Sequence, residues 1–364
     1  MDGSQDNSTE DREFEFTDYT QRVIVATLLM IISVVGITGN SMIHLAVLLS
    51  KKLRTVTNAF VVNLSIADWL TCFVIPWNSV ALLSTDGLPV SEWFCKVVAI
   101  VQFTTVGCSI ITLGFIAVNR LMLITRPTTT YHVFFTSQRV TLWLILSWLV
   151  PLLTSLIPPL AGVGAVGYNP QYHFCGSKPS NPYYNTYNLI IAAVLYPIPL
   201  VKIVVSYSLI WIHLRRHAKK MAGAPKQQAR RSVPIDIPMV PPHSEDTNTA
   251  EHPSRSDVNT SPSRKRKRQT DVTKNMVYVV CGFGLCATPY AINLFFFDRG
   301  PTIPYTTVIL LLSNCINPLI YATKHRDFKL IFGFIIRRQW DKIPNPSDFL
   351  KKARQAKYCC AREL

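Results

Sequence analysis

The chain alternates between long blocks of apolar residues and shorter polar stretches. Seven of the blocks approach or exceed the roughly 20 residues that a helix needs to cross a bilayer. These blocks are Val23–Leu49, Ala59–Leu83, Val97–Ile124, Val140–Leu160, Leu189–Ile212, Met276–Phe297 and Ile303–Ala322. The pattern predicts an all-α membrane protein whose core is a seven-transmembrane helix bundle.

The connections between the blocks are mostly short, so consecutive helices should be neighbours in one bundle. Two connections are long. Ala161–Asn185 is rich in Gly, Pro, Tyr and Asn and contains Cys175. Segment 218–270 combines Pro, Ser, Lys and Arg with few residues that could form a core, which predicts a disordered loop. No internal repeat of the transporter kind is visible. Residues 22–324 are predicted to form one domain, since the short connections keep the helices in one bundle.

An amphipathic eighth helix is predicted at 325–340, after the last apolar block. Its apolar and basic residues interleave, as in a helix that lies in a membrane interface. They include Phe328, Leu330, Ile331, Phe334 and Ile335 beside Arg326, Lys329, Arg337 and Arg338. The final tail, 341–364, carries Cys359 and Cys360 in basic surroundings. Palmitoylation and free cytoplasmic thiols are both consistent with these cysteines.

Composition supports a membrane protein and excludes several other classes. Of the 364 residues, 49% are hydrophobic and only 16% are charged, whereas soluble proteins usually carry about 25% charged residues. A soluble enzyme, a nucleic-acid-binding domain and a secreted disulfide scaffold are therefore excluded.

The distribution of charge predicts the orientation. The net charge is +16, yet the first twenty residues hold seven carboxylates and a single arginine. Basic residues concentrate in the first connection, in 215–274 and in the C-terminal tail, and such residues stay in the cytoplasm. We expect a multi-pass plasma-membrane protein with residues 1–21 extracellular, the C-terminus cytoplasmic and anionic lipid as a partner. A nucleic-acid partner is not expected, since the run Arg264–Arg268 is explained by its place beside the membrane.

A glycosylation sequon supports this orientation. Asn7-Ser8-Thr9 lies on the predicted external side, so Asn7 is the expected glycosylation site. The sequon at Asn259 lies in the predicted cytoplasmic loop and should stay unmodified.

The third block carries a cysteine at one end and an arginine at the other. Cys95 and Arg120 are 25 residues apart by subtraction, or about 37 Å of helix, so they should lie at opposite membrane boundaries. An external cysteine needs a partner in an oxidising compartment. Cys175 is the other cysteine on the predicted external side, which predicts a Cys95–Cys175 disulfide.

A carboxylate inside the second block stands out. Asp68 is costly at this depth unless it meets partners or a cation. Polar residues at comparable depth are Asn40, Ser109, Ser313 and Asn317, which supply the oxygen ligands that a hard monovalent cation prefers. The alternative is a neutral, hydrogen-bonded Asp68 that only packs the bundle.

The motifs together resemble the class A (rhodopsin-like) G protein-coupled receptors over nearly the whole chain. One motif alone is weak, but all of them stand in order at compatible spacings. They are Gly39-Asn40, the Asp68 motif, Cys95, Asn119-Arg120-Leu121, Trp148 with Pro158, Pro199 with Tyr207, Phe283-x-x-Cys286-x-x-Pro289, and Asn317-Pro318-Leu319-Ile320-Tyr321.

The resemblance implies roles for several residues. Asp68, Ser109, Ser313 and Asn317 match a sodium-binding pocket, which makes sodium an expected allosteric modulator; no other cofactor and no catalytic residue are expected. The residues that match the activation switch are Asn119, Arg120, Tyr207, Phe283, Pro289, Asn317, Pro318 and Tyr321. A heterotrimeric G protein, arrestin and receptor kinases are the implied cytoplasmic partners.

Two departures from the family pattern change the expected mechanism. Asn119 stands where the family usually has Asp, so Arg120 lacks its adjacent counter-ion and basal signalling is expected. Ala287 stands where the family's toggle tryptophan is expected, so Phe283 or Tyr290 would have to transmit the ligand signal.

The resemblance also indicates which residues face the ligand cavity. Gln102 replaces the Asp that pairs with amine ligands, and Leu311 replaces the lysine that retinal requires. The set is mostly apolar, which favours an uncharged or amphipathic small molecule, a lipid or a short peptide. The expected ligand-binding residues are Gln102, Phe103, Val106, His173, Ala287, Tyr290, Leu294 and Thr307.

Within class A, the sequence resembles melatonin receptors, the moody-like orphans and the medium-chain-fatty-acid receptor, which suggests inhibitory-type coupling. The alternatives are a small seven-helix transporter or channel and an intramembrane hydrolase. The first would need a polar path through the membrane. The second would need a catalytic constellation, which the membrane-region residues His44 and His213 do not supply.

Overall fold

The computed structural model describes residues 15–85, 90–222, 278, 280–293 and 300–360, with the side chains of 217–222 and 356–360 left out. Six described helical segments are long and apolar enough to span a membrane. They are α1 (Tyr19–Leu49), α2 (Val56–Leu83), α3 (Glu92–Thr125), α5 (Ser137–Leu160), α6 (Tyr184–Leu195) continued by α7 (Pro197–Ala222), and α9 (Ile303–Lys324). Residues 280–293 are also helical and belong to the sixth predicted block, whose remainder lies outside the described residues.

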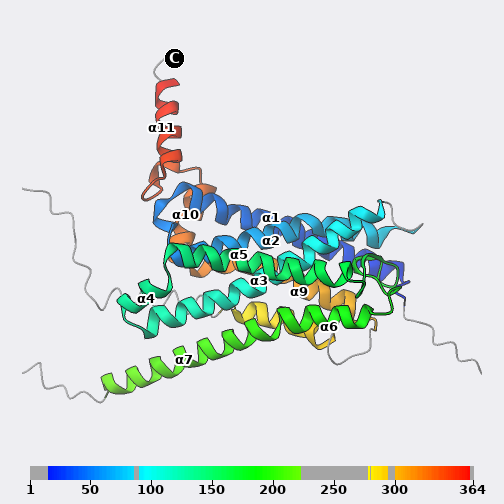
Figure 1. The fold of residues 1–364 in the computed structure, drawn as a ribbon. Coiled ribbons are helices and arrows are strands. Elements are labelled where there is room, and N and C mark those ends of the chain that lie inside the picture. The colour runs from blue at the N-terminus through cyan, green and yellow to red at the C-terminus, as the bar shows by residue number, and fades with distance from the viewer. Residues whose placement is uncertain (1–14, 86–89, 223–277, 279, 294–299, 361–364) are drawn as a thin grey trace, which may run out of the picture.

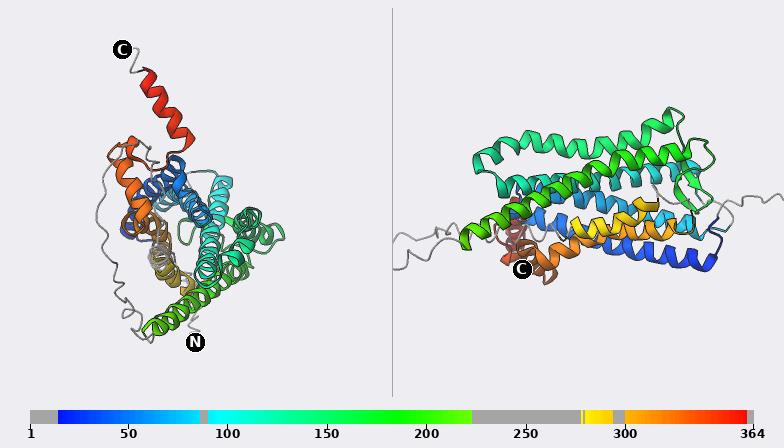
Figure 2. Two further views of the ribbon diagram at one scale, coloured as in Figure 1. Left: turned by 90° about the vertical axis from the view of Figure 1, so that its left-hand side faces the viewer. Right: turned by 90° about the horizontal axis from the view of Figure 1, so that it is seen from below.

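The spanning helices run side by side in one bundle (Figure 1). A two-stranded antiparallel hairpin, β1 (Val166–Asn169) and β2 (Phe174–Ser177), covers one end, called here the hairpin end. At the opposite end, called the α10 end, lie η1 (Lys51–Leu53), α4 (Thr128–Phe134), α10 (Arg326–Ile336), η2 (Trp340–Lys342) and α11 (Asp348–Cys360). The view along the bundle in Figure 2 shows α3 enclosed by its neighbours.

Side chains that precede a helix define several of its starts. Asp18 accepts hydrogen bonds from the backbone N–H groups of Thr20 and Gln21, at 2.9 and 3.3 Å. Thr55 and Thr136 cap α2 and α5 in the same way. Such caps satisfy backbone donors that have no partner within the helix.

Proline interrupts the fifth span. Its first part, α6, ends at Leu195, and α7 begins at Pro197. Pro197 and Pro199 have no backbone N–H to continue the helical hydrogen bonding, and their rings clash with the preceding turn. The half of this span nearer the hairpin is therefore a separate helix, α6.

Small residues allow the helices to approach closely, as is usual in membrane bundles. A Cβ added at Gly39 on α1 would lie 2.7 Å from Pro318 Cγ on α9, and one at Gly107 on α3 would lie 2.5 Å from Pro151 Cβ on α5. Neither glycine could become alanine without movement of a neighbouring helix.

The hairpin end is closed by both the hairpin and the start of the chain. The Phe16 amide donates to the Gln171 carbonyl at 2.8 Å, and its ring is 2% exposed. That ring packs edge-on against Tyr305 of α9 at 6.1 Å between centroids. Phe16, just before α1, therefore packs as part of the folded domain.

Several element boundaries differ from those expected. The tail expected at 1–21 ends earlier, because α1 begins at Tyr19. The loop expected from 218 begins later, because α7 continues to Ala222; the rest of 218–270 lies outside the described residues. Within 325–340, α10 ends at Ile336 and η2 follows.

The contact between α1 and α9 generates a stability prediction. Gly39→Ala should lower the thermal unfolding midpoint by several degrees, since overpacking a tight contact costs about 1–3 kcal/mol. Gly333→Ala on α10 is the matched control, because its added Cβ meets nothing within 4 Å. The measurement is thermal unfolding of the purified protein in one detergent. An unchanged midpoint for Gly39→Ala would contradict the close contact.

Candidate functional site

A cavity opens between α3, α6 and α9 and the helix at 280–293. It contains about 780 Å³ of space free of atoms, including its open mouth. Its walls are mainly apolar, and its polar groups come from Gln102, Asn188, Tyr290 and Thr307. The lining also includes Phe103, Val106, Ile191, Ala192, Leu195, Tyr196, Ala287 and Ala291. We refer to this space as the deep chamber.

An outer chamber lies above the deep one, beneath the hairpin. It is lined by hairpin residues that include Asn169, Phe174 and Gly176, and by Ile303 and Pro304 of α9. The two chambers share Gln102, Phe103, Asn188, Tyr290 and Thr307. A ligand in the deep chamber would therefore lie next to the hairpin.

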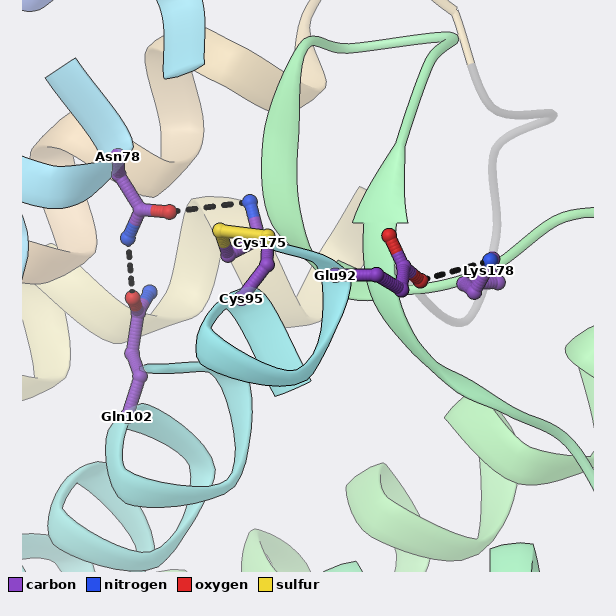
Figure 3. The surroundings of a disulfide bond; sticks show 6 residues. All are labelled: Asn78, Glu92, Cys95, Gln102, Cys175 and Lys178. Carbon is purple, nitrogen blue, oxygen red and sulfur yellow. Dashed lines mark hydrogen bonds and ion pairs between the residues drawn. A yellow bond between two sulfur atoms is a disulfide. The ribbon is translucent and has the colours of Figure 1, made fainter. Parts of the chain in front are cut away.

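The predicted disulfide is present and holds the hairpin onto α3. Cys95 and Cys175 are bonded, with 5.2 Å between their Cα atoms. The Cys175 backbone N–H donates to Asn78 Oδ1 at 3.0 Å, and Asn78 Nδ2 donates to Gln102 Oε1 at 2.6 Å (Figure 3). The covalent bond and this relay join the hairpin to the floor of the outer chamber.

A salt bridge lies on the other side of the disulfide. Lys178, just after β2, contacts Glu92 at the start of α3 at 2.8 Å (Figure 3). Both side chains are partly exposed, so the pair contributes about 0–1 kcal/mol at most. The salt bridge attaches the end of β2 to the start of α3.

His173, expected to contact the ligand, does not line either chamber. It occupies the hairpin turn, where its Nδ1 is 2.8 Å from Tyr168 Oη and its Nε2 is 3.6 Å from Glu15. Burial and then the nearby Arg22 lower the pKa of His173. The neutral imidazole therefore predominates at neutral pH, and its contact with Glu15 is not an ion pair.

A buried polar centre lies deeper, around Asp68. Ser109 on α3 donates to one carboxylate oxygen at 2.8 Å, and Asn317 on α9 donates to the other at 2.7 Å. Ser313 instead donates to the Leu310 carbonyl of its own helix at 2.6 Å. Asn40 donates to the carbonyls of Gly36 and Asn314. Asp68 therefore links α2 directly to α3 and α9.

A second polar cluster was not expected from the sequence. Asn63 Nδ2 donates to the hydroxyls of Thr112 and Ser147 at 2.8 and 3.1 Å, and its Oδ1 accepts from Trp148 at 2.9 Å. This amide joins α2, α3 and α5. Its sequence signal was a second polar residue in the same apolar block, five positions before Asp68.

The α10 end of the bundle buries Arg120, the arginine of the expected activation switch. Arg120 is 3% exposed, and Tyr207 and Tyr321 lie within electrostatic range of it. Among the described residues, Arg120 Nε and the hydroxyls of Tyr207 and Tyr321 have no hydrogen-bond partner. Buried polar atoms without partners are uncommon and costly.

Asn119 forms hydrogen bonds to α2 and α4. Its Oδ1 accepts from the Thr57 hydroxyl on α2 at 2.9 Å, and its Nδ2 donates to the Tyr131 hydroxyl on α4 at 3.0 Å. The Asn that replaces the usual carboxylate therefore fixes α4 to the bundle without making an ion pair.

The remaining switch residues lie between the two ends. Phe283 is buried in the main core, as is Ala287. Pro318 lies inside α9 against Gly39, and Pro289 lies within the helix at 280–293. Lys202, a cation within an apolar span, places its ammonium 5.3 Å from the centre of the Phe115 ring, an attraction that offsets part of its desolvation.

Some expected sites lie outside the described residues. They are Asn7, Leu294 and the side chains of Cys359 and Cys360. The backbone of Cys359 and Cys360 forms the end of helix α11.

Comparison with known proteins identifies the family. Residues 39–321 match the model of the 7 transmembrane receptor (rhodopsin family). The chain is 30% identical to melatonin receptor type 1B of Rattus norvegicus, over 87% of this chain and 79% of that protein. It is 24% identical to the G-protein coupled receptor moody of Drosophila melanogaster, over 88% of this chain and 52% of that protein.

Other matches share the fold or part of the length. Alpha-1D adrenergic receptor of Mus musculus is 27% identical, over 88% of this chain and 58% of that protein. The chain thus spans little more than half the length of the moody and adrenergic relatives. Squid rhodopsin superposes with a TM-score of 0.68 at 21% identity, covering 93% of this chain and 86% of that one.

The fold of squid rhodopsin is a seven-helix bundle, which assigns the helix at 280–293 to the sixth span. The match to the family model runs from Gly39 in the first span to Tyr321 in the last. The family consists of multi-pass plasma-membrane receptors rather than enzymes. This chain belongs to the rhodopsin family of seven-transmembrane receptors, class A of the G protein-coupled receptors.

Proposed function

We propose that this protein receives an extracellular small-molecule signal in the deep chamber and activates a heterotrimeric G protein at the α10 end. The hairpin end would be extracellular and the α10 end cytoplasmic, in agreement with the acidic start and the basic tail of the chain. Signal transmission would involve outward movement of the sixth span, which contains Phe283 and Pro289.

The observation that carries this proposal is the course of α3. One helix supplies Gln102, Phe103 and Val106 to the deep chamber, Ser109 to the polar centre, and Asn119 and Arg120 to the α10 end. A ligand that shifts this helix changes the contacts at all three levels together. Differential binding to two arrangements of the helix is what a signalling switch requires.

The unpartnered atoms at the α10 end support a switch at that position. Arg120, Tyr207 and Tyr321 come from three different spans, and each has a buried polar atom without a partner among the described residues. A rearrangement that brings these groups into contact, or offers them to a bound protein, would regain hydrogen-bond energy. The unsatisfied polar atoms therefore favour a rearrangement of the three spans at the α10 end.

The chamber favours an uncharged or amphipathic ligand. Its walls are largely apolar, and its polar groups are amides and hydroxyls rather than charges. Gln102, whose amide oxygen already accepts from Asn78, offers no carboxylate to an ammonium group. An amine ligand held by an ion pair, as the name of the adrenergic relative could suggest, is thus disfavoured.

Sodium is the modulator proposed for the polar centre. The donor set suits a hard monovalent cation, since it combines the Asp68 carboxylate with the hydroxyls of Ser109 and Ser313 and the amide of Asn317. In addition, Asn40 Oδ1 is buried without a hydrogen-bond partner among the described residues. The Asp68, Ser109, Ser313 and Asn317 side chains would hold the ion and stabilise the inactive arrangement.

Inhibitory-type coupling with basal activity is the proposed signalling mode. The likeness to melatonin receptor type 1B supports the coupling class, and the absence of a carboxylate at Asn119 supports the basal activity. Arrestin and receptor kinases are proposed as further partners of the cytoplasmic end. A transporter or channel, the alternative from sequence, has no support from the family match.

Ligand-free signalling tests the switch. Membranes that contain the wild-type protein should accelerate nucleotide exchange on an inhibitory-type G protein, and Arg120→Ala should abolish this exchange. Asn119→Asp should reduce it several-fold, because the carboxylate still accepts from Thr57 and also pairs with Arg120. The bond to Tyr131 would then reverse, with the tyrosine hydroxyl as the donor. Exchange that persists without Arg120, or an Asn119→Asp variant with full basal activity, would contradict the proposed switch.

Sodium sensitivity tests the polar centre. Replacing choline chloride with sodium chloride should lower ligand-free exchange by the wild-type protein, since the ion favours the inactive arrangement. Asp68→Asn should respond equally to the two salts, because it removes the charge while retaining the shape. Thr71→Val, at a buried hydroxyl bonded to Thr105 on the same pair of helices, is the control and should keep the sodium response. A sodium response retained in Asp68→Asn would argue against the site.

Filling the deep chamber tests the ligand site. Ala287→Trp should reduce the potency of an agonist found by screening uncharged and amphipathic compounds by at least about tenfold, because the indole occupies the cavity. Leu285→Trp is the control, since Leu285 is 76% exposed on the outside of the same helix. Equal potency at both variants would place the ligand elsewhere.

A further inference from the structure

The C-terminal tail is fastened to the first connection. Beyond η2, the Asn345 carbonyl accepts from Lys51 N at 2.9 Å, and the Ser347 amide donates to the Leu49 carbonyl at 2.9 Å. The Ser50 hydroxyl donates to the Pro344 carbonyl at 2.7 Å. We refer to residues 343–348, held on this connection, as the tail clasp.

The tail clasp is part of the bundle core. Ile343 and Leu350 are 3% and 5% exposed, and both belong to the same apolar cluster as Leu49 and Leu53. The clasp begins 19 residues beyond the end of α9 (343 minus 324). It would not bury such side chains unless it had a fixed position.

The clasp fixes the direction of α11. Ser347 Oγ accepts from the Leu350 amide at 3.3 Å and caps the helix, and Lys51 pairs with Asp348 at 2.7 Å. The Lys51 ammonium lowers the pKa of Asp348, so the pair stays charged at neutral pH. In Figures 1 and 2, α11 extends outward from the rim of the bundle, crosswise to the spanning helices. This direction is that of a membrane surface.

An isolated helix of this length needs a partner. α11 has 13 residues, and helices shorter than about 12–15 residues are marginal in water. Past Leu350, its described side chains through Gln355 are exposed or half-buried. The rest of the described chain therefore supplies little packing to stabilise most of α11.

The charges around the clasp indicate the partner. All three carboxylates between 326 and 355 are used in ion pairs, Asp327 with Lys52, Asp341 with Arg354 and Asp348 with Lys51. Exposed cations nearby form no salt bridge among the described residues; they are Arg337, Arg338, Lys342, Lys351 and Lys352. Two large apolar side chains lie exposed among them, Ile336 (71%) and Phe349 (59%).

We propose that the tail clasp holds α11 on the bilayer surface as a second interfacial helix, which binds anionic lipid headgroups through Lys351 and Lys352 and inserts Phe349 into the interface. Exposed cations interspersed with large apolar side chains are the mark of such helices. Anionic headgroups attract each nearby Lys or Arg, and the bundle is already embedded in the same bilayer. The partner is thus present at high local concentration.

Amide hydrogen exchange of the full-length protein in nanodiscs tests this proposal without ligand or G protein. We expect the α11 amides to exchange at least about tenfold more slowly in discs that contain phosphatidylserine than in discs of phosphatidylcholine alone. Lys351→Glu with Lys352→Glu should remove this difference. Lys96→Glu, a charge reversal at an exposed residue of the hairpin end, is the control and should preserve it.

A clasp variant separates positioning from charge. Ile343→Asp keeps both lysines but buries a charge in the clasp, so α11 should lose its protection in discs of either composition. Equal α11 exchange in the two wild-type discs, or protection that survives the double lysine reversal, would overturn lipid binding. Full protection in Ile343→Asp would overturn the role of the clasp.

Discussion

The bundle depends on the need to satisfy, within protein, a carboxylate that water does not reach. Asp68 is 1% exposed, and its two oxygens accept from Ser109 and Asn317 on different helices. In a bilayer, polar groups that lack internal partners cost several kcal/mol. The relative positions of α2, α3 and α9 are therefore fixed by a few hydrogen bonds in addition to the close packing of the helices.

Because polar groups must find partners within the protein, α3 is the helix that connects the two ends of the bundle. Its hairpin end is bonded to Cys175, its middle meets Asp68 and Asn63, and its other end holds Thr57 and Tyr131 through Asn119. The tethers differ in strength. The covalent one is permanent, whereas the others are hydrogen bonds that can exchange partners, so movement is easiest away from the hairpin.

Much of the architecture could be predicted from the apolar blocks, because a spanning helix is specified by local composition. The Cys95–Cys175 bond followed from the orientation. Six of the eight expected ligand residues line the deep chamber; they are Gln102, Phe103, Val106, Ala287, Tyr290 and Thr307. His173 lies outside the lining of both chambers, since a residue in the hairpin turn can point toward Glu15 instead. Asn63, Asn78, the hairpin, α4 and the tail clasp were missed. Each depends on contacts between distant segments, and short polar stretches carry no periodicity that reveals them.

Asn119 has a consequence for how the receptor would respond to its surroundings. A carboxylate beside Arg120 could take up a proton at low pH, and the strength of its ion pair would vary with ionic strength. The amide has no proton to exchange in this range and no net charge to screen. The contacts from α3 to Thr57 and Tyr131 should therefore depend little on pH or ionic strength. Any response of the resting state to salt would then have to arise at another site, such as the polar centre around Asp68.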